Sequence, residues 1–268
     1  MDEWTSFNTL YATDQYAVRN PLGDHALQRA PGDANRQWLR APAPPHLPAR
    51  PSSGKESTVP ELTVAEEVVL IALDDQTGGG RTRLGLDWAL AGAVIVELAL
   101  TQRIAVSDDD VVSVVDPAPT GVGHLDAVLA EAGGGVKVSK LLRRTRTGTP
   151  VRTVTALVER GVLQRKRTWL LGVVPAYRYP VADASAEAEV RARLAAAVLD
   201  GDAPSERTAG LIGVLHAAKL WRRAVPAGER KQVRKRMGEI AKSQSISPAV
   251  RRAIVRTQGA IAAMTSSG

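Results

Sequence analysis

The sequence predicts a mainly α-helical fold: a single globular helical domain around a buried central helix, with small β-hairpins and a disordered N-terminal tail. Residues 86–100 are apolar on nearly every side, which is typical of a helix buried all round. Further helical segments follow, separated by Gly and Pro. Eight of the sixteen prolines lie in residues 1–60, which favours an extended, solvated chain. We therefore expect a Pro-rich tail over 1–60 and one domain over 61–268.

The domain is expected to begin with a capped helix. Thr63 and Glu66 have the spacing of a capping box, in which each side chain satisfies a backbone amide of the other residue. A helix should run from there to about Leu73 and end in the flexible loop 74–80. In the following segment 86–100, LDWALAGAVIVELAL, only two residues are charged, so this segment should form the central helix.

A hairpin and a short helix should follow the central helix. β-Branched residues over 103–106 and 111–115 flank a turn cluster, which indicates two paired strands. Residues 125–132 form an amphipathic pattern that ends at three consecutive glycines. This pattern predicts one short helix.

The second half begins with a basic region and continues as helices. Residues 138–146 and 151–160 indicate two basic helices separated by a Gly/Pro-interrupted loop. Residues 161–174 indicate a strand, a basic turn and a second strand. The remaining predicted helices cover residues 186–200, 207–223, 229–243 and 248–264.

Charge is distributed unevenly along the 268 residues. The net charge is +7 and the pI is near 10.0, which favours anionic partners such as nucleic acid or a phospholipid surface. Residues 61–136 carry thirteen acidic and three basic residues, a net charge of −10, whereas residues 137–182 carry eleven basic residues and Glu159, a net charge of +10. Such regions either face each other or form one charged face, and only the second arrangement points to an outside partner.

Several classes of function find no support in the sequence. There is no cysteine, which excludes disulfides, thiolate metal sites and cysteine nucleophiles. None of the four histidines has a partner at metal-ligand spacing, and no phosphate-binding loop or Gly-x-Ser-x-Gly elbow is present. No stretch approaches the roughly 18 apolar residues of a membrane span, and the first twenty residues lack a secretory-signal pattern. We therefore expect a cytoplasmic protein that is not an enzyme and binds no metal or cofactor.

The basic cluster over residues 137–167, with ten basic residues and one acidic residue, is the strongest functional feature. Basic residues on helix surfaces are often only solvated, and that interpretation is about equally favoured. The hairpin favours an interfacial membrane anchor, because cations next to an apolar tip suit an anionic leaflet. The residues of this expected anchor are Arg165, Lys166, Arg167, Trp169, Leu170 and Leu171.

Several strings of the chain resemble the Golgi phosphoprotein 3 family, which includes many bacterial proteins, and we expect this chain to be a bacterial member. The order and spacing of these strings carry the resemblance, which covers residues 61–260. They are LTVAEEVVLIALDD (62–75), GAVIVELALTQRI (92–104), PAPTGVGHLDAVL (117–129), LVERGVL (157–163), WLLG (169–172) and RTAGLIGVLHAAKLW (207–221).

The resemblance implies a mostly helical fold and a lipid-binding role. Eukaryotic members of the family are peripheral proteins that recognise phosphatidylinositol 4-phosphate, hold glycosyltransferases by their cytosolic tails and touch the bilayer with a hydrophobic hairpin. The positions of the family's headgroup-binding Trp and three Arg fall at Thr82, Ala91, Thr147 and Pro150, so none is kept in register. The nearby residues that can substitute are Arg81, Arg83, Trp88, Arg144, Arg146 and Arg152.

We therefore expect a peripheral protein on the cytosolic membrane face that binds anionic phospholipid headgroups. Cytosolic tails of membrane proteins and a second copy of the chain are further expected partners. One alternative is a winged-helix nucleic-acid-binding protein, in which a basic helix and hairpin act as recognition helix and wing. The long loop expected between Thr145 and Pro150 argues against it. Another alternative is a scaffold in which the −10 region of one subunit faces the +10 region of another.

Overall fold

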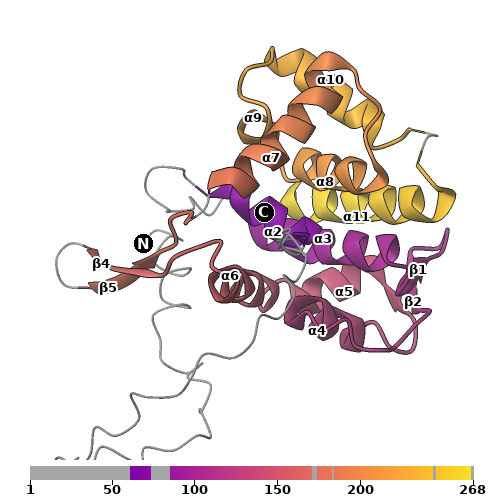
Figure 1. Cartoon of the computed structure of the whole chain (residues 1–268). Coiled ribbons are helices and arrows are strands. Elements are labelled where there is room, and N and C mark those ends of the chain that lie inside the picture. Colours follow the sequence, from indigo (N-terminus) through magenta and orange to yellow (C-terminus); the bar gives the residue numbers. More distant parts are fainter. Residues whose placement is uncertain (1–60, 74–84, 171–173, 183, 244–245, 267–268) are drawn as a thin grey trace, which may run out of the picture. The chain divides into compact units, whose positions relative to one another are not determined.

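The computed structural model describes residues 61–73, 85–170, 174–182, 184–243 and 246–266, and these are mainly helical, as predicted (Figure 1). The tail expected over 1–60 and the loop expected over 74–80 lie outside the described residues. The helical elements are α2 (Val64–Ala72), α3 (Leu86–Leu100), α4 (Gly123–Glu131), α5 (Val138–Thr145), α6 (Thr149–Glu159), α7 (Ala184–Ala195), the π-helical η2 (Ala196–Asp200), α8 (Glu206–Ala217), α9 (Trp221–Ala224), α10 (Arg230–Ile240) and α11 (Pro248–Ser266). The strands are β1 (Ile104–Val106), β2 (Val111–Val114), β3 (Val136–Lys137), β4 (Lys166–Leu170) and β5 (Val174–Arg178).

The start of α2 confirms the predicted capping box. The Thr63 hydroxyl accepts a hydrogen bond from the Glu66 amide at 3.3 Å, and the Glu66 carboxylate accepts one from the Thr63 amide at 2.8 Å. These bonds satisfy two backbone donors that a helix start otherwise leaves unpaired. Every residue of α2 is buried, so the box is enclosed by the core.

Helix α3 is the predicted central helix. Residues 89–99 of α3 are all buried, and the helix packs against α2, α4, α5, α6, α8 and α11. Glycine allows the closest of these approaches: a Cβ atom on Gly92 would lie 2.7 Å from both Thr257 and Ile261 of α11. Likewise, a Cβ atom on Gly213 of α8 would lie 2.6 Å from Ile254 of α11. The three helices therefore form a tightly packed core.

The first sheet has one more strand than predicted. β1 and β2 pair antiparallel with Ala105 opposite Ser113, which confirms the expected hairpin. β3 adds to the other side of β2, with Val136 opposite Val112. A strand of two residues is too short to show an alternating pattern, so the sequence does not reveal it.

The prediction of a long loop between Thr145 and Pro150 is wrong. α5 ends at Thr145 and α6 begins at Thr149, so only residues 146–148 form the turn. Pro150 lies in the first turn of α6, where a proline is tolerated because the amide it lacks has no helical partner. Thr149 strengthens the junction by donating its hydroxyl to the Thr145 carbonyl at 2.9 Å.

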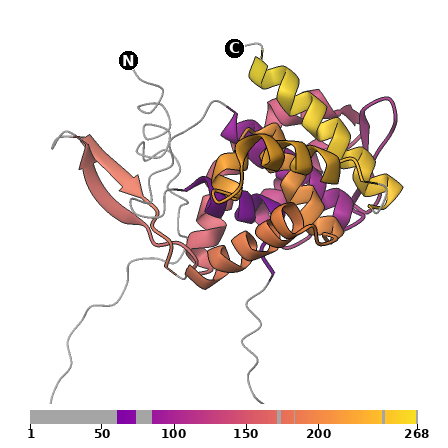
Figure 2. The same ribbon diagram turned by 90° about the horizontal axis from the view of Figure 1, so that it is seen from above.

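The second sheet is a basic hairpin, as predicted, but its strands lie several residues further along the chain than predicted. The basic residues do not form the turn: Lys166 and Arg167 lie on β4 itself, which runs to Leu170, and β5 begins only at Val174. Long basic side chains are compatible with a two-stranded ribbon whose faces meet solvent, so their clustering does not by itself mark a turn. Both views show the hairpin as a ribbon beside the helices (Figures 1 and 2).

One of the C-terminal helices, α8, is shorter than predicted. α8 ends at Ala217, because Lys219 adopts a left-handed conformation with φ of 57° and a new helical turn, α9, follows. The prediction of one helix to residue 223 is therefore wrong. Helices α7, α10 and α11 lie where segments 186–200, 229–243 and 248–264 predicted them. Among the described residues, none of the helices has both the length and the apolarity that a membrane span requires.

Candidate functional site

Trp88 and Arg146 form an aromatic and cationic cluster at the start of α3. Trp88 lies in the first turn of α3, and Arg146 directly follows α5. The Arg146 guanidinium lies 4.6 Å from the centroid of the Trp88 ring, and its Nη1 atom lies 2.5 Å from Oδ2 of Asp87. Because Arg146 and Asp87 are both partly exposed, the cluster is accessible. The ring and the carboxylate together hold the guanidinium in one orientation.

Arg152 lies near this cluster, at the start of α6. Its side chain folds back over the turn, since a Cβ atom on Gly148 would come within 2.3 Å of Arg152 Nη1. The side chain of Arg152 is exposed, and the first turn of α6 has no side-chain cap. The structure thus brings Trp88 and Arg146 into contact, and it places the side chain of Arg152 over the turn between α5 and α6.

Helix α5 presents a basic face beside this junction. Lys140, Arg143 and Arg144 are exposed at helical spacing, whereas Val138, Leu141, Leu142 and Thr145 are buried on the other side. Arg144 lies 3.8 Å from Glu131, with both side chains about half exposed, so this ion pair is weak. In the part of the chain that the structure describes, no carboxylate pairs with Lys140 or Arg143.

The hairpin carries a second group of cations. Lys166 lies directly opposite Arg178, and both are exposed. Like charges in such cross-strand positions repel each other. Arg165 is held over the ring of Tyr177, 3.8 Å from its centroid, and Arg167 is exposed at the next position of β4 after Lys166.

The structure leaves part of the predicted site undescribed. The predicted headgroup residues Arg81 and Arg83 lie outside the described residues, and so does Leu171 of the predicted apolar tip. The backbone of Trp169 and Leu170 is placed at the end of β4, opposite Pro175 and Val174. The expected membrane anchor therefore remains a prediction.

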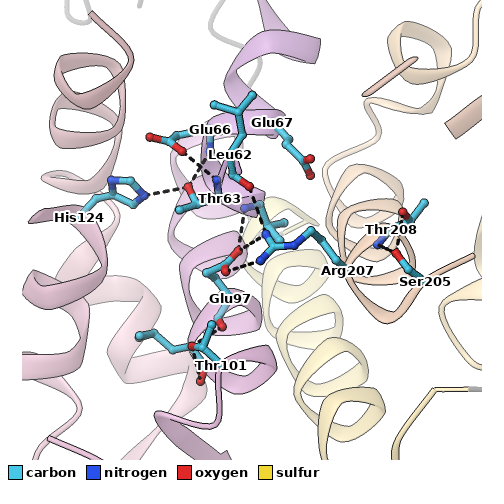
Figure 3. A network of polar contacts seen from close by, with 12 residues as sticks. Leu62, Thr63, Glu66, Glu67, Glu97, Thr101, His124, Ser205, Arg207 and Thr208 are labelled. Atoms are coloured by element: carbon cyan, nitrogen blue, oxygen red, sulfur yellow. Dashed lines mark hydrogen bonds and ion pairs between the residues drawn. The ribbon is translucent and has the colours of Figure 1, made fainter. Parts of the chain in front are cut away.

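A buried network of carboxylates was not predicted, and its centre is Glu97 of α3 (Figure 3). Glu97 is buried, and Arg207 of α8 donates to both of its carboxylate oxygens at 2.8 and 2.9 Å. The Val64 amide at the start of α2 donates to the same carboxylate at 2.9 Å. Glu97 is the only charged residue in the fully buried part of α3, and this position was the available signal for the network. A buried carboxylate requires a cation and hydrogen bonds.

Two glutamates of α2 extend this network. Glu66 is buried and pairs with Arg160 at 2.7 Å, and Glu67 pairs with Arg193. Burial raises the pKa of Glu67, although its ion pair with Arg193 acts in the opposite direction. Both carboxylates also lie in the first turn of α2, where the helix dipole favours negative charge.

His124 closes the network on the side of α4. Its Nε2 atom lies 3.0 Å from the Thr63 hydroxyl, and its Nδ1 atom has no hydrogen-bond partner among the described residues. Burial lowers the pKa of His124, against the opposing effect of Glu66 and Glu97. Because both His124 and Thr63 are buried and Thr63 caps α2, we interpret the pair as structural. No cluster of metal-ligating side chains occurs in the described ranges.

The uneven charge of the sequence thus has two structural outcomes. Six carboxylates of the acidic region pair with downstream arginines: the three glutamates of α2 and α3 are buried, whereas the three aspartates form partly exposed pairs. These pairs are Glu66–Arg160, Glu67–Arg193, Asp87–Arg146, Glu97–Arg207, Asp108–Arg252 and Asp110–Arg256. The cations of α5 and β4 remain at the surface instead.

Comparison with known proteins identifies the family. Residues 64–257 match the family model described as Golgi phosphoprotein 3 (GPP34). The chain is 30% identical over 166 residues to vacuolar protein sorting-associated protein 74 of Eremothecium gossypii, an alignment that covers 50% of this chain and 48% of that protein. The chain thus spans about half the length of the curated relative that it matches. Because the family model covers most of the domain, this protein belongs to the Golgi phosphoprotein 3 family.

Proposed function

We propose that this protein is a non-enzymatic peripheral membrane protein that binds anionic phospholipid headgroups of the phosphatidylinositol 4-phosphate type. Two surfaces would act together on the cytosolic face of a membrane. The helix surface consists of Trp88, Lys140, Arg143, Arg144, Arg146 and Arg152. The hairpin surface consists of Arg165, Lys166, Arg167 and Arg178, with Trp169, Leu170 and Leu171 as the inserting tip.

One observation carries the proposal: the cations of α5 and the hairpin are exposed, whereas three upstream glutamates, Glu66, Glu67 and Glu97, are buried and paired with arginines. The excess positive charge is therefore concentrated where an anionic surface can reach it. Each basic residue near such a surface contributes about 1 kcal/mol. An anion between Lys166 and Arg178 would also relieve their mutual repulsion.

The helix surface supplies groups for a phosphate. Arg146 is oriented by Asp87 and Trp88, and its guanidinium retains N–H donors beyond the one directed at Asp87. Arg152, exposed in the first turn of α6, adds a second cation. This combination suits a phosphate through charge-assisted hydrogen bonds. It would replace the family's headgroup residues, which are not kept in register.

Vesicle flotation tests the proposal. We expect the full chain to float with phosphatidylcholine vesicles that contain phosphatidylserine, more strongly with phosphatidylinositol 4-phosphate, and not with phosphatidylcholine alone. Lys140→Glu with Arg143→Glu should weaken flotation at least tenfold. The matched control, Arg230→Glu with Arg234→Glu on the exposed face of α10, should change it much less. Equal losses in both variants would contradict a specific helix surface.

The inserting tip needs a separate test. We expect the variant Trp169→Ala, Leu170→Ala, Leu171→Ala to lose flotation at high salt, where insertion rather than charge holds the protein on the vesicle. A variant that floats like the wild type at every salt concentration would rule out insertion by the hairpin.

A winged-helix nucleic-acid-binding protein is the second candidate, and the short turn between α5 and α6 favours it. After the three-residue turn come helix α6 and then the basic hairpin, which is the order of a recognition helix and a wing. The exposed residues of α6, however, are Arg152, Thr155 and Glu159, which carry no net charge. Duplex DNA binding with a steep salt dependence, together with no flotation, would reverse the order of the two candidates.

A further inference from the structure

A third group of cations lies near the N-terminal end of α11. A cavity of about 450 Å³ opens there. Its lining includes Lys242, Arg251, Arg252 and Arg256, with Asp108 as the one acidic residue and Val255 as an exposed apolar one. We call the four basic residues and Val255 the α11 site. The four cations face two carboxylates, Asp108 in the lining and Asp110 beside Arg256, so the cavity has an excess of positive charge.

Two arginines of the α11 site, Arg252 and Arg256, contact the β1–β2 hairpin. Arg252 Nε lies 2.9 Å from Asp108 Oδ1, and Arg252 Nη1 donates to the Val106 carbonyl at 3.3 Å. Arg256 Nη1 lies 3.2 Å from Asp110 Oδ1. A guanidinium has five N–H donors, so these contacts orient the two groups without using all their donors. The carboxylates thus pre-organise the cations for a ligand.

The α11 site is distinct from the helix surface. At the C-terminal end of α11, Thr265 packs against Gly85, which immediately precedes α3 and lies three residues before Trp88. Arg252 lies thirteen residues before Thr265, which corresponds to about 20 Å along a helix. A single headgroup cannot reach both places, so the α11 site would take a ligand of its own.

We propose that the α11 site binds a phosphorylated organic molecule. Several guanidinium groups around one cavity suit a phosphate monoester, because each planar fork of N–H donors can bind two oxygens of the tetrahedral phosphate. The volume lies within the range of small-molecule sites and exceeds what a phosphate ion alone would fill. Val255 offers an apolar contact for the organic part of the ligand. A soluble metabolite and a lipid headgroup share this chemistry.

Glycerol 3-phosphate is the probe for a soluble ligand, with glycerol as its uncharged control. We expect saturable binding of glycerol 3-phosphate to the full chain by calorimetry, and none of glycerol. Lys242→Ala with Arg251→Ala should weaken the binding of glycerol 3-phosphate at least tenfold, because it removes two of the four cations. The fold should tolerate this change, since neither side chain forms an ion pair in the described part of the chain. The matched control Arg230→Ala with Arg234→Ala, on α10 but outside the cavity, should bind like the wild type.

Vesicles that contain phosphatidic acid test the lipid source of the same chemistry. Flotation that falls in Lys242→Ala with Arg251→Ala, but not in the α10 control, would support the α11 site with a lipid ligand, even if glycerol 3-phosphate does not bind. Equal behaviour of the two variants with both probes would overturn the proposal. Arg251→Lys keeps the charge but loses the planar fork, so unchanged binding in this variant would overturn the role of guanidinium geometry. These outcomes are independent of Lys140→Glu with Arg143→Glu, which tests the helix surface.

Discussion

Arginine has opposite roles in two regions of this protein. Around α2 and α3, Arg160, Arg193 and Arg207 are directed inward and neutralise buried glutamates. On α5 and β4, the cations are directed to solvent. Each buried Glu–Arg pair removes one charge of each sign from the surface, so these pairs leave the net charge of +7 unchanged. The distribution of the remaining charges over the surface, not their total, is what bears on an anionic partner.

The largest effect should follow from breaking the interior region at Glu97. Arg207→Ala would leave a buried carboxylate without its cation, which should lower the free energy of unfolding by about 3–5 kcal/mol. Arg143→Ala, on the exposed face of α5, should change it by less than about 0.5 kcal/mol. Urea denaturation of both variants measures the difference. Similar losses in the two would show that the interior pair is not special.

The same interior pair can be tested by replacing both partners. Glu97→Gln with Arg207→Met keeps an acceptor for the Val64 amide and removes both charges. We expect this double variant to be more stable than Arg207→Ala alone, because no charge is left buried and unpaired. A double variant that is less stable than the single one would mean that the charges themselves stabilise the core.

Ionic strength should separate the two regions with an effect of intermediate size. Vesicle binding by the exposed cations should fall tenfold or more between low and high salt, since exposed charges are screened beyond a Debye length of about 8 Å at physiological salt. The urea midpoint of the wild type should change little over the same range, because buried pairs are screened much less. Vesicle binding that is insensitive to salt would contradict an electrostatic role for α5 and β4.

Protonation of His124 should make the free energy of unfolding depend on pH. Burial lowers its pKa, so the unfolded imidazole takes up a proton near pH 6.5 while the folded one does not. The free energy of unfolding should therefore fall as pH drops below 6.5. Glu67 acts in the opposite direction. Its pKa is raised in the folded protein, so its contribution to the free energy of unfolding increases as pH falls through that pKa. His124→Gln, which can still contact Thr63, should remove the His124 contribution, and urea midpoints at several pH values measure the difference between the two proteins.

A small effect on stability is expected at the Trp88–Arg146 cluster, which lies between the two regions. Arg146→Ala removes a cation–π contact and a partly exposed ion pair, so it should cost about 0.5–1 kcal/mol of stability. Its effect on flotation with phosphatidylinositol 4-phosphate should be larger than its effect on stability. Parallel denaturation and flotation measurements check this. A variant that loses stability but floats normally would remove Arg146 from the proposed headgroup site.

The sequence predicts the helices better than the contacts between them. The apolar run of α3 and the Thr63–Glu66 pair each depend on neighbouring residues, so their patterns are visible in the chain. Pro150 misled the prediction, because a proline is equally compatible with a loop and with the first turn of a helix.

Partners far apart in the chain could not be predicted. Glu97 clearly requires a cation, but Arg207 lies 110 residues away and only the fold selects it among many basic residues. The same holds for the α11 site, which joins a turn after β1 to a helix near the end of the chain. Which arginines turn inward is a property of packing, and local sequence does not record it.

The tight packing of α11 has a further consequence for ligands. Because α11 is held along its length against α3 and α8, it acts as a rigid spacer between its two ends. Its span of about 20 Å between Arg252 and Thr265 is more than twice the physiological screening length. A charge bound at one end is thus largely screened from the other end. Two ligands should therefore occupy the two ends independently, with neither altering the affinity for the other.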